Sequence, residues 1–191
     1  MNKKNGPTLG HNKKSLLKSE VEHIDIKSFD SRKIIESMKK MSFTSRDTAK
    51  AAEIYNEMIK DKNCSIFLTI AGSTSAGGCM KLYSDLVKYN MVDAIVATGA
   101  SIIDMDFFEA LGFKHYQGDQ FQDDKILREN YIDRIYDTYI DEEDLQICDK
   151  TICDIANKLP PKAYTSREFI KEIGKYLKKN AKKKNSLIEV A

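Results

Sequence analysis

The sequence lacks the long apolar segments that membrane proteins and secretory precursors carry. No apolar run in the 191 residues reaches the roughly 18–20 residues that span a bilayer. The N-terminal residues 1–18 are polar and Lys-rich and contain no apolar core of the kind that a secretory signal requires. We therefore expect a cytoplasmic chain that does not interact with a membrane.

Cysteine and histidine are scarce, and their spacing is not that of a metal site. The chain has four cysteines and three histidines. No two cysteines form a C-x-x-C pair, and the histidines are scattered along the chain. Without a secretion signal, we expect reduced thiols. A zinc site would need short-range ligand pairs that the sequence lacks, so we assign no metal-binding residues.

The chain also lacks a strong excess of either charge. Its 31 Lys and Arg residues nearly balance 29 Asp and Glu residues, which argues against attraction of the whole protein to nucleic acid. Residues 2–18 and 171–184 are basic and residues 119–154 are acidic. These stretches indicate a disordered basic leader over residues 1–17 and solvated helix faces; alternatively, the acidic stretch attracts a cationic partner such as a polyamine. Residues 18–191 then form one domain.

Two short apolar runs are typical of buried strands. Residues 65–71 are rich in strand-forming residues, and a loop of small residues at 72–78 follows them. An amphipathic helix leads to the second run, residues 93–98, which ends in a small-residue turn at 99–101 and another helix. This repeated order predicts an α/β fold with a Rossmann-like parallel sheet and crossover helices.

The segments around this pattern are expected to be helical. A capping box at Thr44–Asp47 predicts the start of a helix before the first strand, and another at Thr165–Glu168 predicts the start of the last long helix. Apolar spacing over residues 126–139 and 145–155 predicts two further helices. Pro160-Pro161 separates the second of these from the last one.

The loop at residues 72–78 is the first candidate for chemistry. Small residues let a phosphate approach the backbone at the carboxyl end of a strand, and Ser73, Thr74 and Ser75 add hydroxyls. The loop is not a Walker A, G-x-G-x-x-G or G-x-S-x-G motif. Both phosphate or dinucleotide binding and a purely structural turn therefore remain open from the pattern alone.

The second loop would lie beside the first if the two strands are neighbours. Thr98, Gly99, Ala100 and Ser101 would then complete a crevice of the kind in which open α/β sheets bind ligands. Asp104 follows, either as a helix cap or as a hydrogen-bond acceptor for a ligand hydroxyl. The next two acids, at positions 106 and 109, are expected to be solvated helix charges.

The segment that joins the two loops carries a family resemblance. Residues 90–100, Asn-Met-Val-Asp-Ala-Ile-Val-Ala-Thr-Gly-Ala, resemble the corresponding segment of deoxyhypusine synthase and its bacterial and archaeal relatives. Supporting segments lie at residues 22–26, 41–43, 107–112 and 115–118. The similarity runs from about Leu17 to the end of the sequence.

The resemblance implies an NAD-dependent aminobutyl transfer on a Rossmann-like fold. In that family, NAD takes a hydride from spermidine, and the four-carbon unit passes through an active-site lysine to a protein lysine or, in homospermidine synthase-like relatives, to a small amine. The resemblance also implies a homo-oligomer with NAD at subunit interfaces. It therefore implies NAD as cofactor and a polyamine as substrate.

The family's cofactor loops can be carried over position by position. The first falls on Ala71-Gly72-Ser73, the second on Thr98-Gly99-Ala100, and the following acid on Asp104. Ser73 stands where the family has asparagine, Gly72 where it has serine, and Asp104 where glutamate is common. The predicted cofactor-binding residues are Gly72, Ser73, Thr74, Thr98, Gly99, Ala100 and Asp104.

The resemblance assigns no catalytic residue to this chain. Family members continue past the segment that matches Ser186–Ala191, and their catalytic lysine, its tryptophan neighbour and most polyamine-binding acids lie in that later half. This sequence contains no tryptophan. We therefore expect the N-terminal half of a family domain, inactive alone, with a complementing C-terminal chain as a possible partner. The alternatives are a non-enzymatic nucleotide-binding or interaction protein, a self-associating truncated product, and a hydrolase or phosphotransferase that uses residues 73–75.

Overall fold

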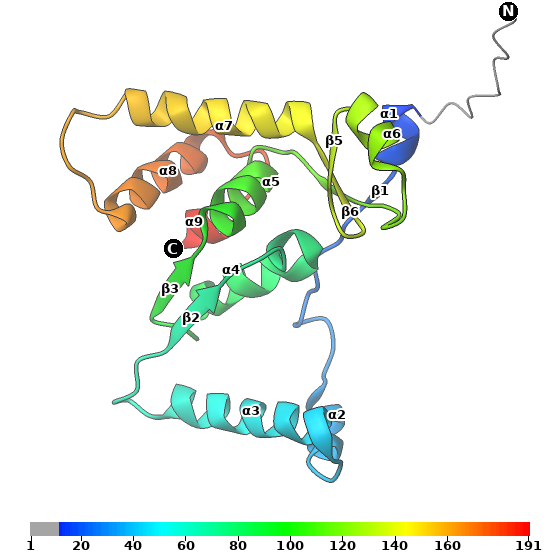
Figure 1. Cartoon of the computed structure of the whole chain (residues 1–191). Coiled ribbons are helices and arrows are strands. Elements are labelled where there is room, and N and C mark those ends of the chain that lie inside the picture. Colours follow the sequence, from blue (N-terminus) through cyan, green and yellow to red (C-terminus); the bar gives the residue numbers. More distant parts are fainter. Residues whose placement is uncertain (1–11) are drawn as a thin grey trace, which may run out of the picture.

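The computed structural model describes residues 12–191, which form helices packed around two small sheets (Figure 1). The strands are β1 Ser19–Glu20, β2 Phe67–Ile70, β3 Ala94–Ala97, β4 His115–Gln117, β5 Ile132–Ile135 and β6 Thr138–Asp141. The α-helices are α1 Lys13–Leu16, α2 Arg32–Met38, α3 Phe43–Lys60, α4 Met80–Lys88, α5 Phe108–Ala110, α6 Asp124–Glu129, α7 Glu142–Asn157, α8 Ser166–Asn180 and α9 Leu187–Val190. Two π-helical segments, η1 Ser75–Cys79 and η2 Ala100–Phe107, precede α4 and α5.

The parallel part of the fold consists of β2 and β3. They pair in register from Phe67 opposite Ala94 to Ile70 opposite Ala97, and η1 and α4 connect them. One face of the pair packs on a cluster that includes Ile70 and Met80, so α4 lies against this face. The two predicted strands and the helix between them are confirmed. The expected burial of the strands is wrong for their other face, where Phe67 and Val96 are exposed.

The larger sheet is antiparallel, with four strands in the order β1-β4-β6-β5. The mixed α/β class is confirmed, whereas within residues 12–191 parallel pairing is limited to β2 and β3. The helix predicted over residues 126–139 is wrong beyond α6, because residues 132–141 form the β5–β6 hairpin. Tyr131 and Tyr136 adopt positive φ and reverse the chain. Apolar spacing over so short a segment fits either structure, and pairing with β4 favours the strands.

The helix starts differ in how they are capped, and α3 has no side-chain cap hydrogen bond. Thr165 and Glu168 form the predicted capping box at the start of α8. The box predicted at Thr44 is wrong, because α3 begins at Phe43 with Ser42 as its N-cap residue. The acidic run of residues 141–144 lies at the start of α7, where the Asp141 carboxylate accepts a hydrogen bond from the Glu143 N–H and carboxylates favour the helix dipole.

The basic leader is attached to this acidic run. Residues 1–11 of the expected disordered leader lie outside the described residues, but Lys13–Leu16 form α1. The Lys13 Nζ lies 2.6 Å from Asp141 Oδ1 and 2.7 Å from Glu143 Oε2. Part of the acidic stretch therefore binds a cation of the same chain, rather than serving as a solvated face alone.

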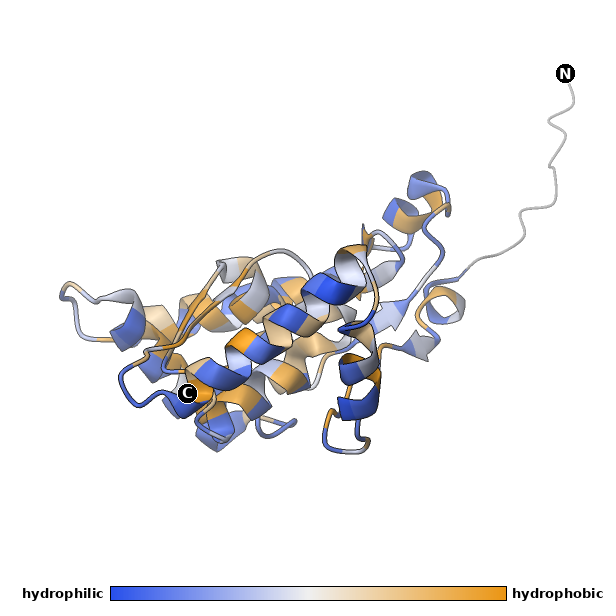
Figure 2. Ribbon diagram, turned by 90° about the horizontal axis from the view of Figure 1, so that it is seen from below, coloured by the Kyte–Doolittle hydropathy of each residue, from blue (hydrophilic) through white to orange (hydrophobic). Residues whose placement is uncertain are grey.

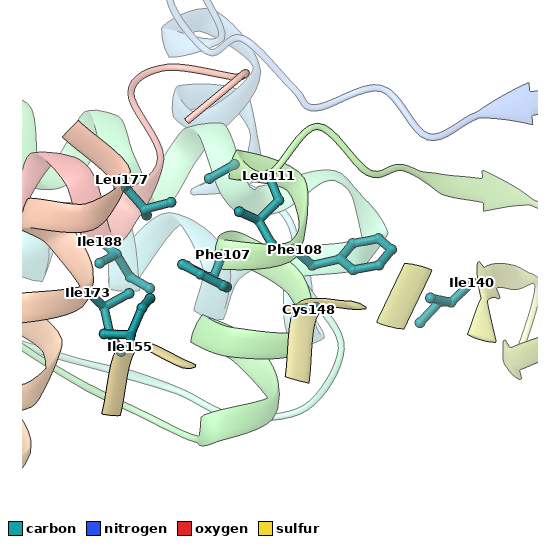
Figure 3. Packing of buried hydrophobic residues seen from close by; sticks show 10 residues of the cluster. Phe107, Phe108, Leu111, Ile140, Cys148, Ile155, Ile173, Leu177 and Ile188 are labelled. Atoms are coloured by element: carbon teal, nitrogen blue, oxygen red, sulfur yellow. The ribbon is translucent and has the colours of Figure 1, made fainter. Parts of the chain in front are cut away.

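The main core lies between α5, α7 and α8 (Figures 1 and 3). Phe107 and Phe108 are fully buried there, and Cys148 of α7 and Leu177 of α8 pack against the same cluster. Burial raises the pKa of the Cys148 thiol to about 12, so this cysteine is a packing residue and not a nucleophile. The helices predicted over residues 145–155 and after Thr165 are confirmed.

Hydrophilic and hydrophobic residues alternate along the surface helices (Figure 2). Helix α3 follows this pattern and, together with α2, lies apart from the main core (Figure 1). Within residues 12–191, no helix combines the length and the apolar character needed to cross a bilayer.

Asp106, expected to be solvated, is fully buried and holds the last helix in place. Its two carboxylate oxygens accept hydrogen bonds from the N–H groups of Leu187, at 2.7 Å, and Ile188, at 2.8 Å. Burial raises the pKa of Asp106 to about 6, although these two N–H groups act in the opposite direction. The carboxylate thus caps α9 from η2, a segment distant in the sequence.

We expect Asp106→Ala to lower the free energy of unfolding by roughly 2–4 kcal/mol, because two buried N–H groups lose their acceptor. Asp104→Ala is the matched control, since this half-buried acid lies on the same segment and caps no helix. Chemical denaturation of both variants measures the difference. Equal losses of stability would show that the carboxylate of Asp106 does not hold α9.

Candidate functional site

The structure brings the two small-residue loops together. Because β2 and β3 are parallel, both loops leave the same edge of the sheet, and the Thr98 N–H donates to the Ile70 carbonyl at 3.2 Å. One turn later, the buried Ser101 hydroxyl donates to the Gly72 carbonyl at 3.1 Å. The predicted adjacency of the loops is confirmed.

Two glycines shape the first loop. Gly72 adopts a φ of +72° and Gly78 a φ of +101°, a region that side chains rarely occupy. A Cβ on Gly78 would also lie 2.9 Å from the carbonyl oxygen of Glu22. Between them, the Thr74 hydroxyl lies 2.7 Å from the Tyr83 hydroxyl of α4. Tyr83 lies on the amphipathic helix expected between the two strands, and the sequence gave no signal that its hydroxyl reaches the loop.

The second loop differs from the expected turn. Gly99 has a helical backbone, with φ −53° and ψ −42°, and η2 begins immediately after it. Thr98 closes the first turn, because its hydroxyl oxygen accepts from the Ser101 N–H at 3.3 Å and lies 3.0 Å from the Ser101 hydroxyl. Ser101 therefore contacts both loops, a role that its position in the sequence did not reveal.

The two loops present an exposed surface of small residues. The exposed members are Gly72, Thr74, Gly77, Thr98, Gly99 and Ala100. A Cβ built on Gly72, Gly77 or Gly99 would meet no atom within 4 Å. Since Gly77 and Gly99 do not need a positive φ, neither strain nor crowding within the chain requires glycine there. This open backbone fits a ligand that makes close contact with main-chain atoms.

The other predicted site residues are less accessible. Ser73 is half-buried, and its carbonyl accepts from the Gly77 N–H at 3.0 Å. Asp104 lies within η2 and is not its N-cap residue, so that alternative is wrong. Burial, together with the negative charge of Asp149 on α7, raises the pKa of Asp104. Its role toward a ligand stays a prediction.

A cleft of about 570 Å³ lies apart from the two loops, between α4, the segment after β1 and the segment before α9. Glu109, expected to be solvated, is buried at this cleft. It contacts His23 Nε2 at 2.6 Å, His115 Nδ1 at 2.9 Å and the Lys183 ammonium. No motif predicts this cluster, because its members are far apart in the sequence.

The cluster keeps Glu109 ionised. Burial raises the pKa of its carboxyl, but hydrogen bonds from His115, His23 and Lys183 outweigh that effect and hold the pKa well below its ordinary value. Each of the two histidines therefore uses one ring nitrogen in its contact with Glu109. Among residues 12–191, no group of three or more His, Cys, Asp and Glu side chains is arranged to hold a metal ion.

The comparisons with known proteins identify the family. Residues 33–191 match the sequence model of the deoxyhypusine synthase family, and the chain therefore belongs to this family. The deoxyhypusine synthase-like protein of Caulobacter vibrioides is 64% identical over 188 residues, which cover 98% of this chain and 51% of that protein. The Coxiella burnetii protein of the same description is 67% identical over 180 residues, or 94% of this chain and 51% of its own length.

The chain spans about half the length of the curated relatives it matches. A more distant relative, the probable deoxyhypusine synthase 2 of Methanosarcina acetivorans, is 33% identical over 165 residues, which cover 86% of this chain and 48% of that protein. Among solved structures, a putative deoxyhypusine synthase from Entamoeba histolytica has a TM-score of 0.53 at 18% identity, covering 90% of this chain and 58% of its own. That similarity supports the fold alone.

We expect acid to weaken the fold through Glu109. A carboxyl whose folded pKa is depressed stabilises the protein above its unfolded pKa, near 4.5, and loses that contribution as the pH falls further. Asp106 acts in the opposite direction between its ordinary 3.8 and about 6, because its pKa is raised in the folded protein.

The comparison of wild type with Glu109→Gln tests the first effect. The charge of Glu109 also contributes to the raised pKa of Asp106, so the comparison is made below the pH range in which Asp106 titrates. The difference in the two free energies of unfolding, measured by denaturation from pH 4.5 to pH 3, should be largest at pH 4.5 and shrink toward pH 3. A difference that does not change with pH would contradict the assignment.

Proposed function

We propose that this chain carries the NAD-binding cradle of a deoxyhypusine synthase-like aminobutyltransferase. The observation that carries the proposal is the pair of exposed small-residue loops side by side at the carboxyl ends of two parallel strands. In open α/β sheets this edge is the usual ligand-binding crevice. The β2–α4–β3 unit would be the first unit of the Rossmann-like sheet that the family resemblance implies.

The chain's own residues would bind and orient the dinucleotide. The backbone of Gly72, Gly99 and Ala100 allows close approach, and Thr74 and Thr98 present hydroxyls on the same surface. Ser73 and Asp104, which are half-buried, would lie beneath this surface. NAD, when bound, would supply a reversible hydride acceptor for oxidation of a polyamine such as spermidine, and a protein lysine or a small amine would receive the aminobutyl group.

Four lysines of residues 12–191 do not have the character of a covalent carrier. A nucleophilic lysine needs a depressed pKa, whereas the pKa values of Lys13, Lys39, Lys81 and Lys114 are all raised. Lys81, which follows the first loop, is paired with Asp85 at 2.6 Å and with Asp25 at 3.2 Å. The lysine nearest the cradle in the sequence is therefore unsuited to carry the aminobutyl group.

The parallel pair has one uncovered face, which supports a partner for this part of the chain. Phe67 and Val96 project from that face and are 65% and 60% exposed. Their register places them on the same side, because Thr69 lies opposite Val96 and shares a face with Phe67. Parallel sheets are ordinarily covered on both faces. We propose that a further copy or a complementing C-terminal chain covers Phe67 and Val96.

We expect Gly99→Ala to weaken NAD binding without weakening the fold. The added methyl group meets no protein atom and suits the helical backbone, so stability should stay equal or rise by about 0.4–1 kcal/mol. Against a ligand in contact with the backbone it should cost about 1–3 kcal/mol of binding. Calorimetric titration with NAD and thermal unfolding measure both, with the exposed Ala52→Val of α3 as control. Unchanged NAD affinity in Gly99→Ala would contradict the proposal that NAD binds at the two loops.

We expect no turnover of spermidine and NAD by the purified chain, and turnover after mixing with the C-terminal half of the Caulobacter vibrioides relative. Phe67→Lys should abolish the rescue by charging the uncovered face, whereas Phe121→Lys, at a residue that is 84% exposed elsewhere, should not. NADH formation and transfer of a labelled aminobutyl group provide the readouts. Turnover by the chain alone would contradict this part of the proposal, and NAD binding without rescue would favour a non-enzymatic nucleotide-binding protein.

A further inference from the structure

The hydrogen bonds within the second loop have a fixed direction. The buried Ser101 hydroxyl has one hydrogen, and it is donated to the Gly72 carbonyl, which can only accept. The 3.0 Å contact between the hydroxyls of Ser101 and Thr98 must then use the Thr98 hydrogen. The hydroxyl of Thr98 has no hydrogen left for a ligand, and its oxygen is an acceptor.

The hydroxyl pair of the first loop behaves differently. Thr74 and Tyr83 share one hydrogen bond at 2.7 Å, so whichever hydroxyl donates, the hydrogen of the other one stays free. Tyr83 also packs against the cluster beneath β2 and β3, which holds its ring and therefore its hydroxyl in place. Thr74 is exposed at the surface of the cradle. The first loop can therefore donate one hydroxyl hydrogen to an anion.

We propose that Ser101 gives the cradle a hydrogen-bond polarity, in which the second loop accepts from a ribose hydroxyl at Thr98 and the first loop donates to a phosphate at the Thr74–Tyr83 pair. The inference rests on the proposed NAD binding and specifies how the ligand is oriented. Phosphate oxygens only accept hydrogen bonds at neutral pH, so Thr98 is unsuited to them.

The spacing of the loops selects the ribose. Adjacent strands lie about 4.8 Å apart, so a ligand group at the second loop must be close to the phosphate at the first. Ribose is the unit bonded directly to each phosphate of a dinucleotide, and its hydroxyls are hydrogen-bond donors. Ser101 is a positioning residue in this arrangement, because it acts through the neighbouring Thr98.

The test uses NAD and a set of NAD analogues that each lack one ribose hydroxyl, titrated calorimetrically into the purified chain. Thr98→Val should lower the affinity for NAD roughly three- to tenfold, and this loss should disappear with the one analogue that lacks the hydroxyl accepted by Thr98. Thr74→Val should lower the affinity for NAD and for every analogue by the same factor. Tyr83→Phe should weaken binding in the same uniform way, whereas Tyr89→Phe, at the C-cap residue of α4, should have no effect.

Ser101→Ala distinguishes an effect on the hydrogen-bond polarity of the cradle from an effect on the stability of the fold. It should reduce the ratio between the affinities for NAD and for the discriminating analogue, a ratio that a loss of fold stability alone does not change. An equal loss in Thr98→Val with every analogue, or a loss in Thr74→Val that disappears with one of them, would overturn the inference while leaving NAD binding intact. Failure of the wild-type chain to bind NAD would instead overturn the proposed function and this inference with it.

Discussion

In-register pairing of β2 with β3 is the interaction on which the candidate site depends. Parallel strands carry their carboxyl ends to the same edge, and the crossover through α4 lets two loops that are separate in sequence leave the sheet together. Ser101 then ties the second loop to the first through the Gly72 carbonyl. Without the pairing, each loop would be an isolated turn with no shared surface.

Two buried carboxylates organise the segments that flank this unit. Burying a charge is costly unless hydrogen bonds compensate for it, and each acid meets that requirement with groups from distant parts of the chain. Asp106 accepts from the N–H groups at the start of α9, and Glu109 accepts from His23, His115 and Lys183. The second loop leads directly into η2 and α5, which carry Asp106 and Glu109. The two acids that bind α9 and His23 therefore lie close to the cradle in the sequence.

The chain belongs to the deoxyhypusine synthase family and spans about half the length of the relatives it matches. In the structure, one face of the parallel pair, with Phe67 and Val96, has no covering layer among residues 12–191. An apolar face on a parallel sheet is stabilised when another layer covers it. In the proposal, a complementing C-terminal chain would both cover this face and supply the covalent carrier, whereas a further copy would cover the face alone.

The sequence by itself determined the two strands β2 and β3, the glycine-rich loops after them, the capping box at Thr165 and the family, because these depend on residues that are neighbours along the chain. Tertiary structure alone decided the β5–β6 hairpin, where a short apolar spacing fits either helix or strand until β4 supplies the pairing partner. It also decided the burial of Asp106 and Glu109 and the direction of the Ser101 hydrogen bond. Burial, charge compensation and hydroxyl direction depend on partners that are distant in the sequence, and local patterns do not encode which partners meet.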